Sequence, residues 1–490
     1  MSLEIVGARV LAPVFGTSVF VWGSIITVFL ASLAAGASLG GRLADLRPQP
    51  AILADLLVAS GVLTWVVFLA PAPVMRFFAE APVPDRFRAL LSAIALFALP
   101  CAVMGTITTF AVRLVAREIA TLGAAAGRLS AISTVGSIAG TFATTFFLIP
   151  AFPTRPILFG IGALLVLAAW IVPAPFSAWR LGRDAVLTTA AVAAHLLAPP
   201  ALGTPPLAGT VVYEKETAYH RIRVVDQGLR RVMYFNNLSQ GYVPVRPDIP
   251  LPPNYTDGFL VALAFPLRPL RSVVVLGLGA GMIPMRMTAR LPEVAVTTIE
   301  IDPEVLSVAG RYFGFVPGPR DRVLLGDGRR ELERHVSETD VIFVDAYFAD
   351  SVPFHLLTRE FYTSCRDRLA SDGVVAANFI GVMTGEGNGL FWAAAKTMQE
   401  VFPRVYVLSG DLAQGNRTFS GNAFLIGSRS PDRLDRATLA ARARALASRM
   451  DRPSVATWGA DLYDGEMRTA GVPILTDDYS PTDALQHFRR

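Results

Sequence analysis

Long apolar runs dominate the first 200 residues of the chain, and short alternating patterns dominate the remainder. A helix needs about 20 apolar residues to cross a hydrocarbon layer of roughly 30 Å. Five runs meet this requirement, at residues 19–39, 51–70, 91–112, 129–150 and 157–172. A sixth, 185–198, is marginally long, and the opening MSLEIVGARVLAPVFG has an interfacial pattern. The pattern predicts an α-helical transmembrane bundle of five to six spans over residues 1–205.

Two glycine pairs within these runs, Gly36/Gly40 and Gly136/Gly140, have the spacing that lets membrane helices approach closely. Ionisable residues occur only at the ends of the predicted spans. Since buried charges usually mark a transport path in a membrane protein, this pattern argues against a carrier.

Arginines in the loops bear on the orientation of the bundle. In an up-and-down arrangement, the loops with Arg42 and Arg47, with residues 113–128, and with Arg180 and Arg183 share one side. The positive-inside rule makes that side cytoplasmic. Six spans would then place the rest of the chain outside the cell, and five would place it inside. We expect five spans plus a short surface or re-entrant helix, because the ligand inferred below is cytosolic. A basic n-region and a small-residue cleavage site are missing, so no cleavable signal peptide is expected.

From Thr210 onward the pattern changes to short strands. The segments VVYEKETAYHRIRVVDQG and RRVMYFNN, divided by a turn at Gln227-Gly228, predict a small antiparallel β subdomain within residues 206–253. After a proline-rich link, the runs VVVLGLGAG, VAVTTIEID, RVLLGDG, DVIFVDAY and GVVAANF alternate with segments of helix length. This rhythm predicts an α/β domain over residues 254–490, built on a doubly wound parallel sheet.

Composition narrows the classes of function. Apolar residues make up 52% of the chain and charged residues only 17%, which is beyond the usual range of soluble proteins. The net charge of +5 comes from scattered arginines, so we expect no basic face for nucleic acid. The two cysteines, Cys101 and Cys365, lie far apart in the sequence. This excludes a disulfide framework and a cysteine-rich metal site, and we expect no metal.

Three glycines at alternate positions indicate a ligand-binding turn. Gly277, Gly279 and Gly281 follow an apolar strand, where the backbone can turn tightly and approach a ligand without Cβ atoms in the way. Glu300 ends the next strand, about 20 residues later, where it can accept hydrogen bonds from both hydroxyls of a ribose. Asp327 lies in a Gly-Asp-Gly turn after the third strand. The third glycine comes one position earlier than in a dinucleotide fingerprint. We therefore expect a nucleoside without a phosphate, such as S-adenosylmethionine or a derivative.

These motifs resemble the spermidine synthase (aminopropyltransferase) family, and more closely its bacterial members fused to a membrane domain. In the membrane half the likeness rests on LEIVGARVLAPVFGTSVFVWGSII and GGRLAD. In the polar half it rests on ETAYHRIRVVD, RVMYFNNLSQG, VLGLGAG, TIEID, LLGDG, DVIFVDAYFADSVPFHLLTREFY and LTDDYSP. The resemblance implies a Rossmann-like, methyltransferase-type sheet. It also implies a multi-pass protein of the bacterial inner (plasma) membrane, with the catalytic domain in the cytoplasm.

The resemblance further implies an amine that attacks the propyl carbon next to a sulfonium and releases 5′-methylthioadenosine. Asp345 would orient or deprotonate that amine, Tyr255 would line the acceptor channel, and Asp350 is a further candidate. An alkylamine has a pKa near 10, so a carboxylate placed at Asp345 is suited to take its proton. The residues implied in binding the donor are Gln240, Gly277, Gly279, Gly281, Glu300, Asp327, Gly328 and His220. His220 stands where the family has a glutamine, and we expect both it and His355 to be structural.

Two departures from the family leave the reaction open. Soluble members carry carboxylates where this chain has Ala280 and Phe348, and those carboxylates hold amine groups of the donor or acceptor. Asp350, or Asp477 and Asp478, would be alternative sources of the missing charge. Aminopropyl transfer from decarboxylated S-adenosylmethionine to a polyamine is therefore weighed against two alternatives. One is cyclisation of intact S-adenosylmethionine to a homoserine lactone, and the other is a non-enzymatic membrane carrier or nucleoside sensor. A homodimer is a candidate assembly.

Overall fold

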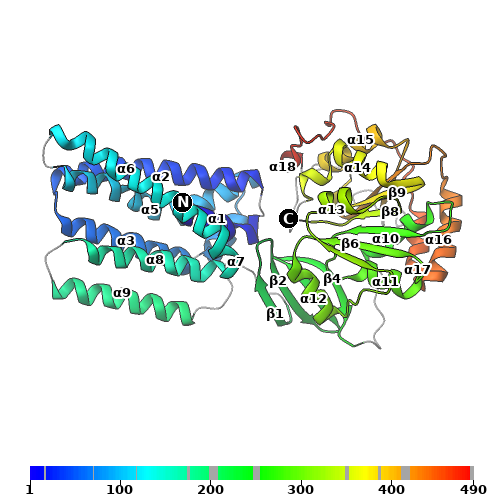
Figure 1. The fold of residues 1–490 in the computed structure, drawn as a ribbon, viewed down its shortest axis with the longest axis horizontal. Coiled ribbons are helices and arrows are strands. Elements are labelled where there is room, and N and C mark those ends of the chain that lie inside the picture. The colour runs from blue at the N-terminus through cyan, green and yellow to red at the C-terminus, as the bar shows by residue number, and fades with distance from the viewer. Residues whose placement is uncertain are drawn as a thin grey trace. The chain divides into compact units, whose positions relative to one another are not determined.

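The protein is represented by a computed structural model. It describes residues 1–15, 18–69, 71–116, 119–173, 177–197, 208–246, 254–347, 352–383, 388–409 and 420–485. The chain forms two compact units, one of Met1–Leu207 with Lys215–Ala218 and one of Ala208–Glu214 with Tyr219–Arg490. Figure 1 shows helices throughout the first unit, and sheets with flanking helices in the second.

The first unit is all helical over its described residues up to Leu197. Five stretches are long and apolar enough to cross a membrane: Val19–Leu46, Pro50–Val67, Phe87–Val115, Gly123–Ala151 and Thr154–Ile171. The described elements are α1 (Ser2–Phe15), α2 (Val19–Leu46), α3 (Pro50–Leu69), α4 (Pro71–Ala79), α5 (Asp85–Val115), α6 (Ile119–Ala143), the π-helical turn η1 (Thr144–Leu148), α7 (Ile149–Ala151), α8 (Thr154–Ile171) and α9 (Ala178–Leu197).

The two glycine pairs noted in the sequence have different surroundings. A Cβ atom at Gly36 would collide with the backbone carbonyl of Ala102, and one at Gly40 would lie 2.6 Å from Thr106, so α2 and α5 are in backbone contact. Gly136 on α6, in contrast, has open space around its Cα. The same spacing therefore supports close packing of the backbones at one pair and not at the other.

Helix α9 packs along α3. Near its start, Nη1 of Arg183 lies 2.8 Å from Oδ1 of Asp55, which is close to the start of α3. Near its end, Ala191 lies in one apolar cluster with Trp65, close to the end of α3. The two helices therefore run in the same direction over a similar length, and α9 (20 residues) is as long as α3.

The second unit begins with a four-stranded sheet in the order β1-β2-β3-β4, in which β2–β3 and β3–β4 are antiparallel. Its strands are β1 (Thr210–Glu216), β2 (Arg221–Gln227), β3 (Arg230–Phe235) and β4 (Leu238–Pro244). Alternate residues such as Ile222 and Val224 pack with Val305 of α12 (Pro303–Phe313) in one core. The predicted turn at Gly228 is present, with a φ of 59°.

A seven-stranded sheet forms the centre of this unit, in the order β10-β11-β9-β8-β5-β6-β7. Strands β5 to β9 are parallel, as the sequence predicts, whereas β10 and β11 are antiparallel to their neighbours at one edge. The parallel-dominated sheet is confirmed, but its antiparallel edge was not predicted. The strands are β5 (Ser272–Leu276), β6 (Ala295–Glu300), β7 (Arg322–Leu325), β8 (Thr339–Val344), β9 (Leu369–Val382), β10 (Arg404–Ser409) and β11 (Ser420–Ser428).

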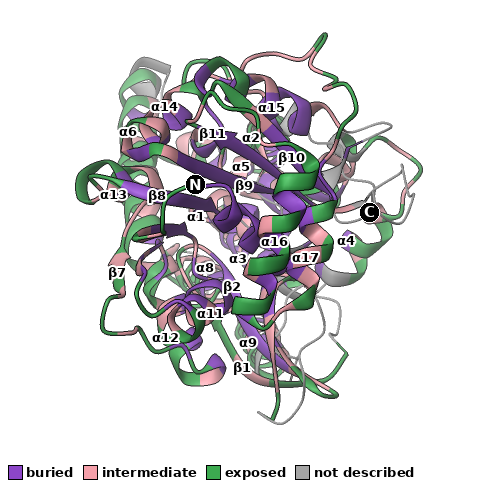
Figure 2. Cartoon of the chain, turned by 90° about the vertical axis from the view of Figure 1, so that its right-hand side faces the viewer, coloured by how far each residue is buried: buried purple, intermediate pink, exposed green. Residues whose placement is uncertain are grey.

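Helices cover both faces of the large sheet. Val274 and Ile342 pack with α14 and α15, while Val273 and Val341 pack with α10, α11, α16 and α17. This coverage explains why β5 and β8 are continuous apolar runs: a strand covered by helices on both faces of the sheet buries the side chains on both of its faces. Figure 2 shows the purple, buried strands β8 and β9 inside this layered unit. The remaining helices are α10 (Tyr255–Leu260), η2 (Val261–Ala264), α11 (Met282–Arg290), α13 (Gly328–His335), η3 (Phe354–Leu356), α14 (Arg359–Arg368), α15 (Gly389–Val401), α16 (Arg436–Met450), α17 (Pro453–Ala460) and α18 (Thr482–Leu485).

The order of the parallel strands defines where a ligand is expected. The chain moves outward from β5 to β6 and β7, then returns to place β8 on the other side of β5. Ligands of open α/β sheets bind outside the carboxyl ends of the strands at such a reversal. The carboxyl ends of β5 and β8 lead directly into Gly277 and Asp345.

Candidate active site

The glycine turn after β5 requires glycine at each alternate position. Gly277, Gly279 and Gly281 have φ values of 92°, 52° and 76°, in the region that other residues rarely adopt. A Cβ atom at Gly277 would also collide with the backbone carbonyl of Asp345, and one at Gly281 would lie 3.0 Å from the ring of Phe315. The turn therefore passes directly beside the end of β8.

Glu300 at the end of β6 ties this turn to the next strand. One carboxylate oxygen accepts a hydrogen bond from the backbone N–H of Leu278 and the other from that of Asp302, each at 2.9 Å. The side chain is buried, and burial raises its pKa although both hydrogen bonds act in the opposite direction. A carboxylate has about four lone-pair sites, so Glu300 can still accept a hydrogen bond from a ribose hydroxyl.

Asp345 lies directly after β8, and its carboxylate has two neutral partners. The hydroxyl of Tyr255 donates to Oδ2 at 3.2 Å, and Nδ2 of Asn378 donates to Oδ1 at 2.9 Å. Burial raises the pKa of Asp345 to about 6, while both hydrogen bonds act to lower it. Burial and the adjacent Asp345 also raise the pKa of Tyr255, which keeps its hydroxyl protonated as a donor. A carboxylate with such a pKa can accept a proton near neutral pH.

The main chain of Gln240 on β4 joins these groups. Its carbonyl oxygen lies 3.4 Å from the Tyr255 hydroxyl, as a second acceptor for the single O–H proton that also faces Asp345, and would lie 3.2 Å from a Cβ atom at Gly279. Its side-chain amide donates to the carbonyl of Leu238. Strand β4 therefore lies against the glycine turn and Tyr255, which brings together four of the predicted site residues: Tyr255, Gln240, Gly279 and Asp345.

Asp327, Gly328 and His220 occupy two further environments. Asp327 caps α13 by accepting from the backbone N–H of Arg330 at 3.0 Å, and Gly328 begins that helix. His220 is buried, and its ring stacks on Phe235 with centroids 4.3 Å apart. Asp350 lies outside the described residues.

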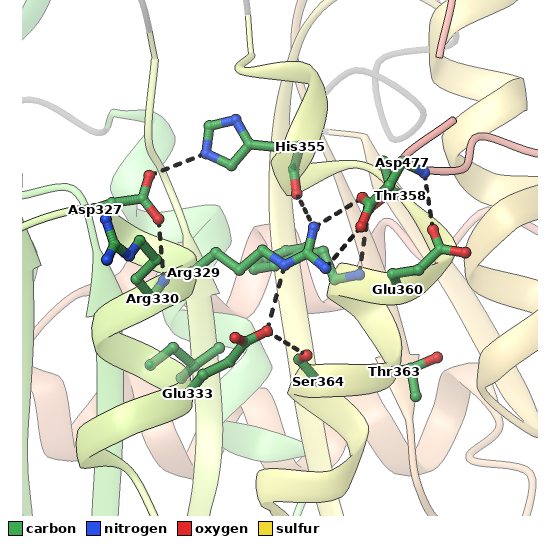
Figure 3. Close-up of polar contacts among 12 residues, drawn as sticks. Asp327, Arg329, Arg330, Glu333, His355, Thr358, Glu360, Thr363, Ser364 and Asp477 are labelled. Carbon is green, nitrogen blue, oxygen red and sulfur yellow. Dashed lines mark hydrogen bonds and ion pairs between the residues drawn. The ribbon is translucent and has the colours of Figure 1, made fainter. Parts of the chain in front are cut away.

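Two further acidic residues are engaged in ion pairs. Asp257 is fully buried and paired with Arg286 at 2.7 Å and Arg452 at 2.7 Å. Asp477 is bound by Arg329 at 2.8 Å, as Figure 3 shows. These contacts indicate structural roles for both carboxylates.

Sequence reasoning missed two asparagines. Asn378 lies within β9 and Asn422 within β11, and Nδ2 of Asn422 donates to Oδ1 of Asn378 at 3.0 Å. This bond orients the Asn378 amide so that its N–H group points to Asp345. An asparagine at the end of the apolar run GVVAANF was the available signal for Asn378. Among the described residues, no group of three or more His, Cys, Asp and Glu side chains is placed to hold a metal ion.

Part of the chain is similar to proteins of a known family. Residues 260–409 match the family described as spermine/spermidine synthase domain. A polyamine aminopropyltransferase of Vibrio vulnificus is 29% identical over 302 residues, which is 59% of this chain and 95% of the relative. A probable polyamine aminopropyl transferase of Bifidobacterium longum is 28% identical over 282 residues, which is 56% of this chain and 62% of the relative.

Among solved structures, a probable spermidine synthase from Corynebacterium glutamicum aligns with a TM-score of 0.43 at 18% identity. The alignment covers 56% of this chain and 99% of that chain. The curated relatives are named as transferases, and the family match supports an enzyme. The match over residues 260–409 confirms that the motifs of this region resemble the spermine/spermidine synthase family.

Proposed function

We propose that the protein is an integral-membrane enzyme of the aminopropyltransferase type. It would bind S-adenosylmethionine or its decarboxylated form, transfer the propylamine portion to an amine such as a polyamine, and release 5′-methylthioadenosine. One observation carries this proposal. Among the described residues, the carboxylate of Asp345 is hydrogen-bonded by the neutral groups of Tyr255 and Asn378, and it lies at the strand reversal beside the glycine turn, in the region that matches the spermine/spermidine synthase domain.

The adenosyl portion of the donor would lie across the carboxyl ends of β5, β6 and β7. Glu300 would accept hydrogen bonds from the ribose hydroxyls through its remaining lone pairs. Asp327 and the start of α13 at Gly328 would face the base, and Gln240 would lie near the sulfonium. The glycine turn supports this placement through its position, because it directly follows β5 at the carboxyl end of the parallel sheet.

The reaction is a displacement at carbon. The lone pair of the amine forms a C–N bond with the propyl carbon, the C–S bond breaks, and its electron pair remains on sulfur as the neutral thioether of methylthioadenosine. The ammonium proton passes to the carboxylate of Asp345 and then to solvent. Because the sulfonium is already a good leaving group, orientation and proton removal are the contributions expected of the protein.

A second candidate reaction has a specific observation in its favour. Ala280, within the glycine turn, is buried and apolar, so this position offers no charge to an amine on the donor. Intact S-adenosylmethionine could then bind, and its own carboxylate could attack the γ-carbon. A C–O bond would form, the C–S bond would break, and homoserine lactone and methylthioadenosine would leave without any base.

We propose that the catalytic unit faces the cytoplasm of a bacterial cell, because the nucleoside donor is made there. With the catalytic unit in the cytoplasm, the number of crossings decides the side of the N-terminus. If α9 crosses the membrane as α3 does, there are six crossings and the N-terminus is also cytoplasmic. If α9 does not cross, there are five crossings and the N-terminus lies outside. The six-crossing arrangement puts the loops with Arg47 and Arg113 outside, against the positive-inside rule.

Reporter fusions that fluoresce only in the cytoplasm, placed at the N-terminus and at the C-terminus, separate these arrangements. A dark C-terminal fusion would refute the cytoplasmic placement.

The reaction itself is tested with the purified full-length protein in detergent. It is incubated with S-adenosylmethionine or the decarboxylated form, with and without putrescine or spermidine, and the products are identified by mass spectrometry. Methylthioadenosine that requires both the decarboxylated donor and an amine supports transfer. Methylthioadenosine and homoserine lactone from intact S-adenosylmethionine alone support cyclisation. Binding of either donor without any methylthioadenosine would refute both reactions and favour a sensor.

A further inference from the structure

The imidazole of His355 contacts the carboxylate of Asp327. Its Nε2 lies 3.1 Å from Oδ2 of Asp327, which is a hydrogen bond when Nε2 carries the proton. The two residues are 28 positions apart, and Figure 3 shows the ring pointing from the η3 turn to the start of α13. Both side chains are partly exposed, at 34% for His355 and 29% for Asp327. The contact therefore lies at the rim of the sheet and does not belong to the apolar core.

Arg329 holds the same turn through its main chain. Its Nη1 donates to the carbonyl oxygen of His355 at 3.4 Å. The guanidinium also binds both oxygens of Asp477, at 2.8 and 2.9 Å, and the hydroxyl of Thr358 donates to Asp477 at 2.7 Å. Figure 3 shows Arg329 at the centre of these contacts. The bidentate pair fixes the guanidinium, so His355 is held at both its side chain and its backbone.

The consequence concerns the orientation of Asp327. Its Oδ1 accepts from the backbone N–H of Arg330 at 3.0 Å, which is sufficient to cap α13. A carboxylate held by one oxygen can still turn about its terminal torsion. The second contact, from His355 to Oδ2, prevents this rotation of the carboxylate. The lone pairs of Asp327 that are not used in these two contacts then keep a fixed orientation. A group held in advance loses less freedom when it binds a ligand.

We propose that His355 is a positioning residue, which orients Asp327 to accept a hydrogen bond from the exocyclic amino group of an adenosyl ligand. This inference rests on the proposed function, because it assumes a nucleoside at the carboxyl ends of the strands. It assigns to His355 a part in ligand selectivity: the protein distinguishes an adenine ring from a purine without that amino group only when the imidazole holds the carboxylate.

The test compares two ligands that differ in one group. They are 5′-methylthioadenosine and its analogue with hydrogen in place of the exocyclic amino group, and their dissociation constants are measured by calorimetry on the full-length protein. In the wild type we expect binding of the analogue to be about tenfold weaker, as for the loss of one hydrogen bond to a charged acceptor. In His355→Ala we expect affinity for methylthioadenosine to fall about tenfold and affinity for the analogue to stay nearly constant, so the selectivity disappears.

Conservative variants separate positioning from folding. The amide nitrogen of Gln reaches the place of the imidazole Nε2, whereas that of the shorter Asn does not. His355→Gln should therefore keep the selectivity and His355→Asn should lose it, whether or not the alanine variant folds. The matched control is His335→Ala, since His335 lies on the helix that Asp327 caps and, within the described part of the chain, its imidazole contacts Glu331. It should retain the wild-type selectivity.

Each outcome has a separate meaning. Loss of selectivity in the Ala and Asn variants, with retention in the Gln variant, supports the positioning role. Equal weakening of both ligands in every His355 variant shows a structural role only and overturns the inference, while the proposed function stands. If the wild type binds methylthioadenosine without distinguishing it from the analogue, the inference is also wrong. A wild type that binds neither ligand overturns the proposed function and this inference with it.

Discussion

Removal of the Tyr255 hydroxyl should move the acid limb of the pH–rate profile to higher pH. The hydroxyl donates to Oδ2 of Asp345 at 3.2 Å and favours the ionised carboxylate. Tyr255→Phe removes this bond and leaves the burial that raises the pKa of Asp345 to about 6. The pKa of Asp345 should therefore rise further, and the base should be protonated at a lower acid concentration, that is, at higher pH.

The length of the Tyr255–Asp345 hydrogen bond indicates how far the pKa of Asp345 should move. A hydrogen bond to a charged group contributes about 1.5–3 kcal/mol, and one pKa unit corresponds to 1.36 kcal/mol. The 3.2 Å separation is long for a bond between two oxygens, so the lower end of this range applies. We expect the midpoint to move from about 6 to about 7. The variant should then be roughly fivefold slower than the wild type at pH 6 and nearly equal to it at pH 8.5.

The assay is the initial rate of methylthioadenosine release with a fixed amine, measured from pH 5 to pH 9. The acceptor amine titrates identically with both enzymes, so its contribution cancels in the ratio of the two profiles. Tyr347→Phe is the matched control, because the Tyr347 hydroxyl bonds the backbone carbonyl of Asn378 and the N–H of Ile380. Its midpoint should stay near that of the wild type. A Tyr255→Phe enzyme slowed equally at every pH would refute the reasoning.

Three further substitutions test the same site. Asp345→Asn should lower turnover with an amine by about 10²–10⁴-fold, as for loss of a general base. The folded protein holds the Asp345 proton more tightly than the unfolded chain, so the free energy of unfolding falls as the pH rises from about 4 to about 6. Asn carries no charge at pH 8, so the Asn variant should be more stable there by at most about 3 kcal/mol and should unfold at a higher temperature. Glu300→Ala should weaken binding of methylthioadenosine roughly ten- to hundredfold in calorimetry, and unchanged affinity would contradict its ribose role. Asp257→Asn leaves the cations of Arg286 and Arg452 without their shared carboxylate, so thermal unfolding should show a loss of about 3–5 kcal/mol.

Much of the site could be predicted because each residue directly follows an apolar run. Gly277, Glu300, Asp327 and Asp345 all lie at the carboxyl ends of parallel strands, and parallel strands bring those ends to one edge of the sheet. The rule needs only strand positions, which continuous apolar runs reveal. The rule places these residues near one another, but it does not predict which side chains form hydrogen bonds with them.

The partners could not be predicted, because they come from segments far apart in the chain. Asn378 is oriented by Asn422 of β11, which is antiparallel and belongs to the edge that the sequence pattern did not indicate. His355 contacts Asp327 from a turn 28 positions later in the chain, and Arg329 contacts the main chain of the same turn. Such contacts depend on register and on turn geometry, and neither leaves a periodic signal in the sequence.

The contrast between two aspartates explains why Asp345 is the candidate base. Asp257 is fully buried and Asp345 is half-buried, and burial acts to raise the pKa of each. At Asp257 the hydrogen bonds from Arg452 and Ser454 and the charge of Arg286 outweigh burial and lower the pKa, so this carboxylate stays ionised and unreactive. At Asp345 the partners are a phenol and an amide, which carry no charge, so burial prevails and the pKa rises to about 6. The charge of the partners, more than the depth of burial, therefore separates a structural carboxylate from one able to exchange a proton near neutral pH.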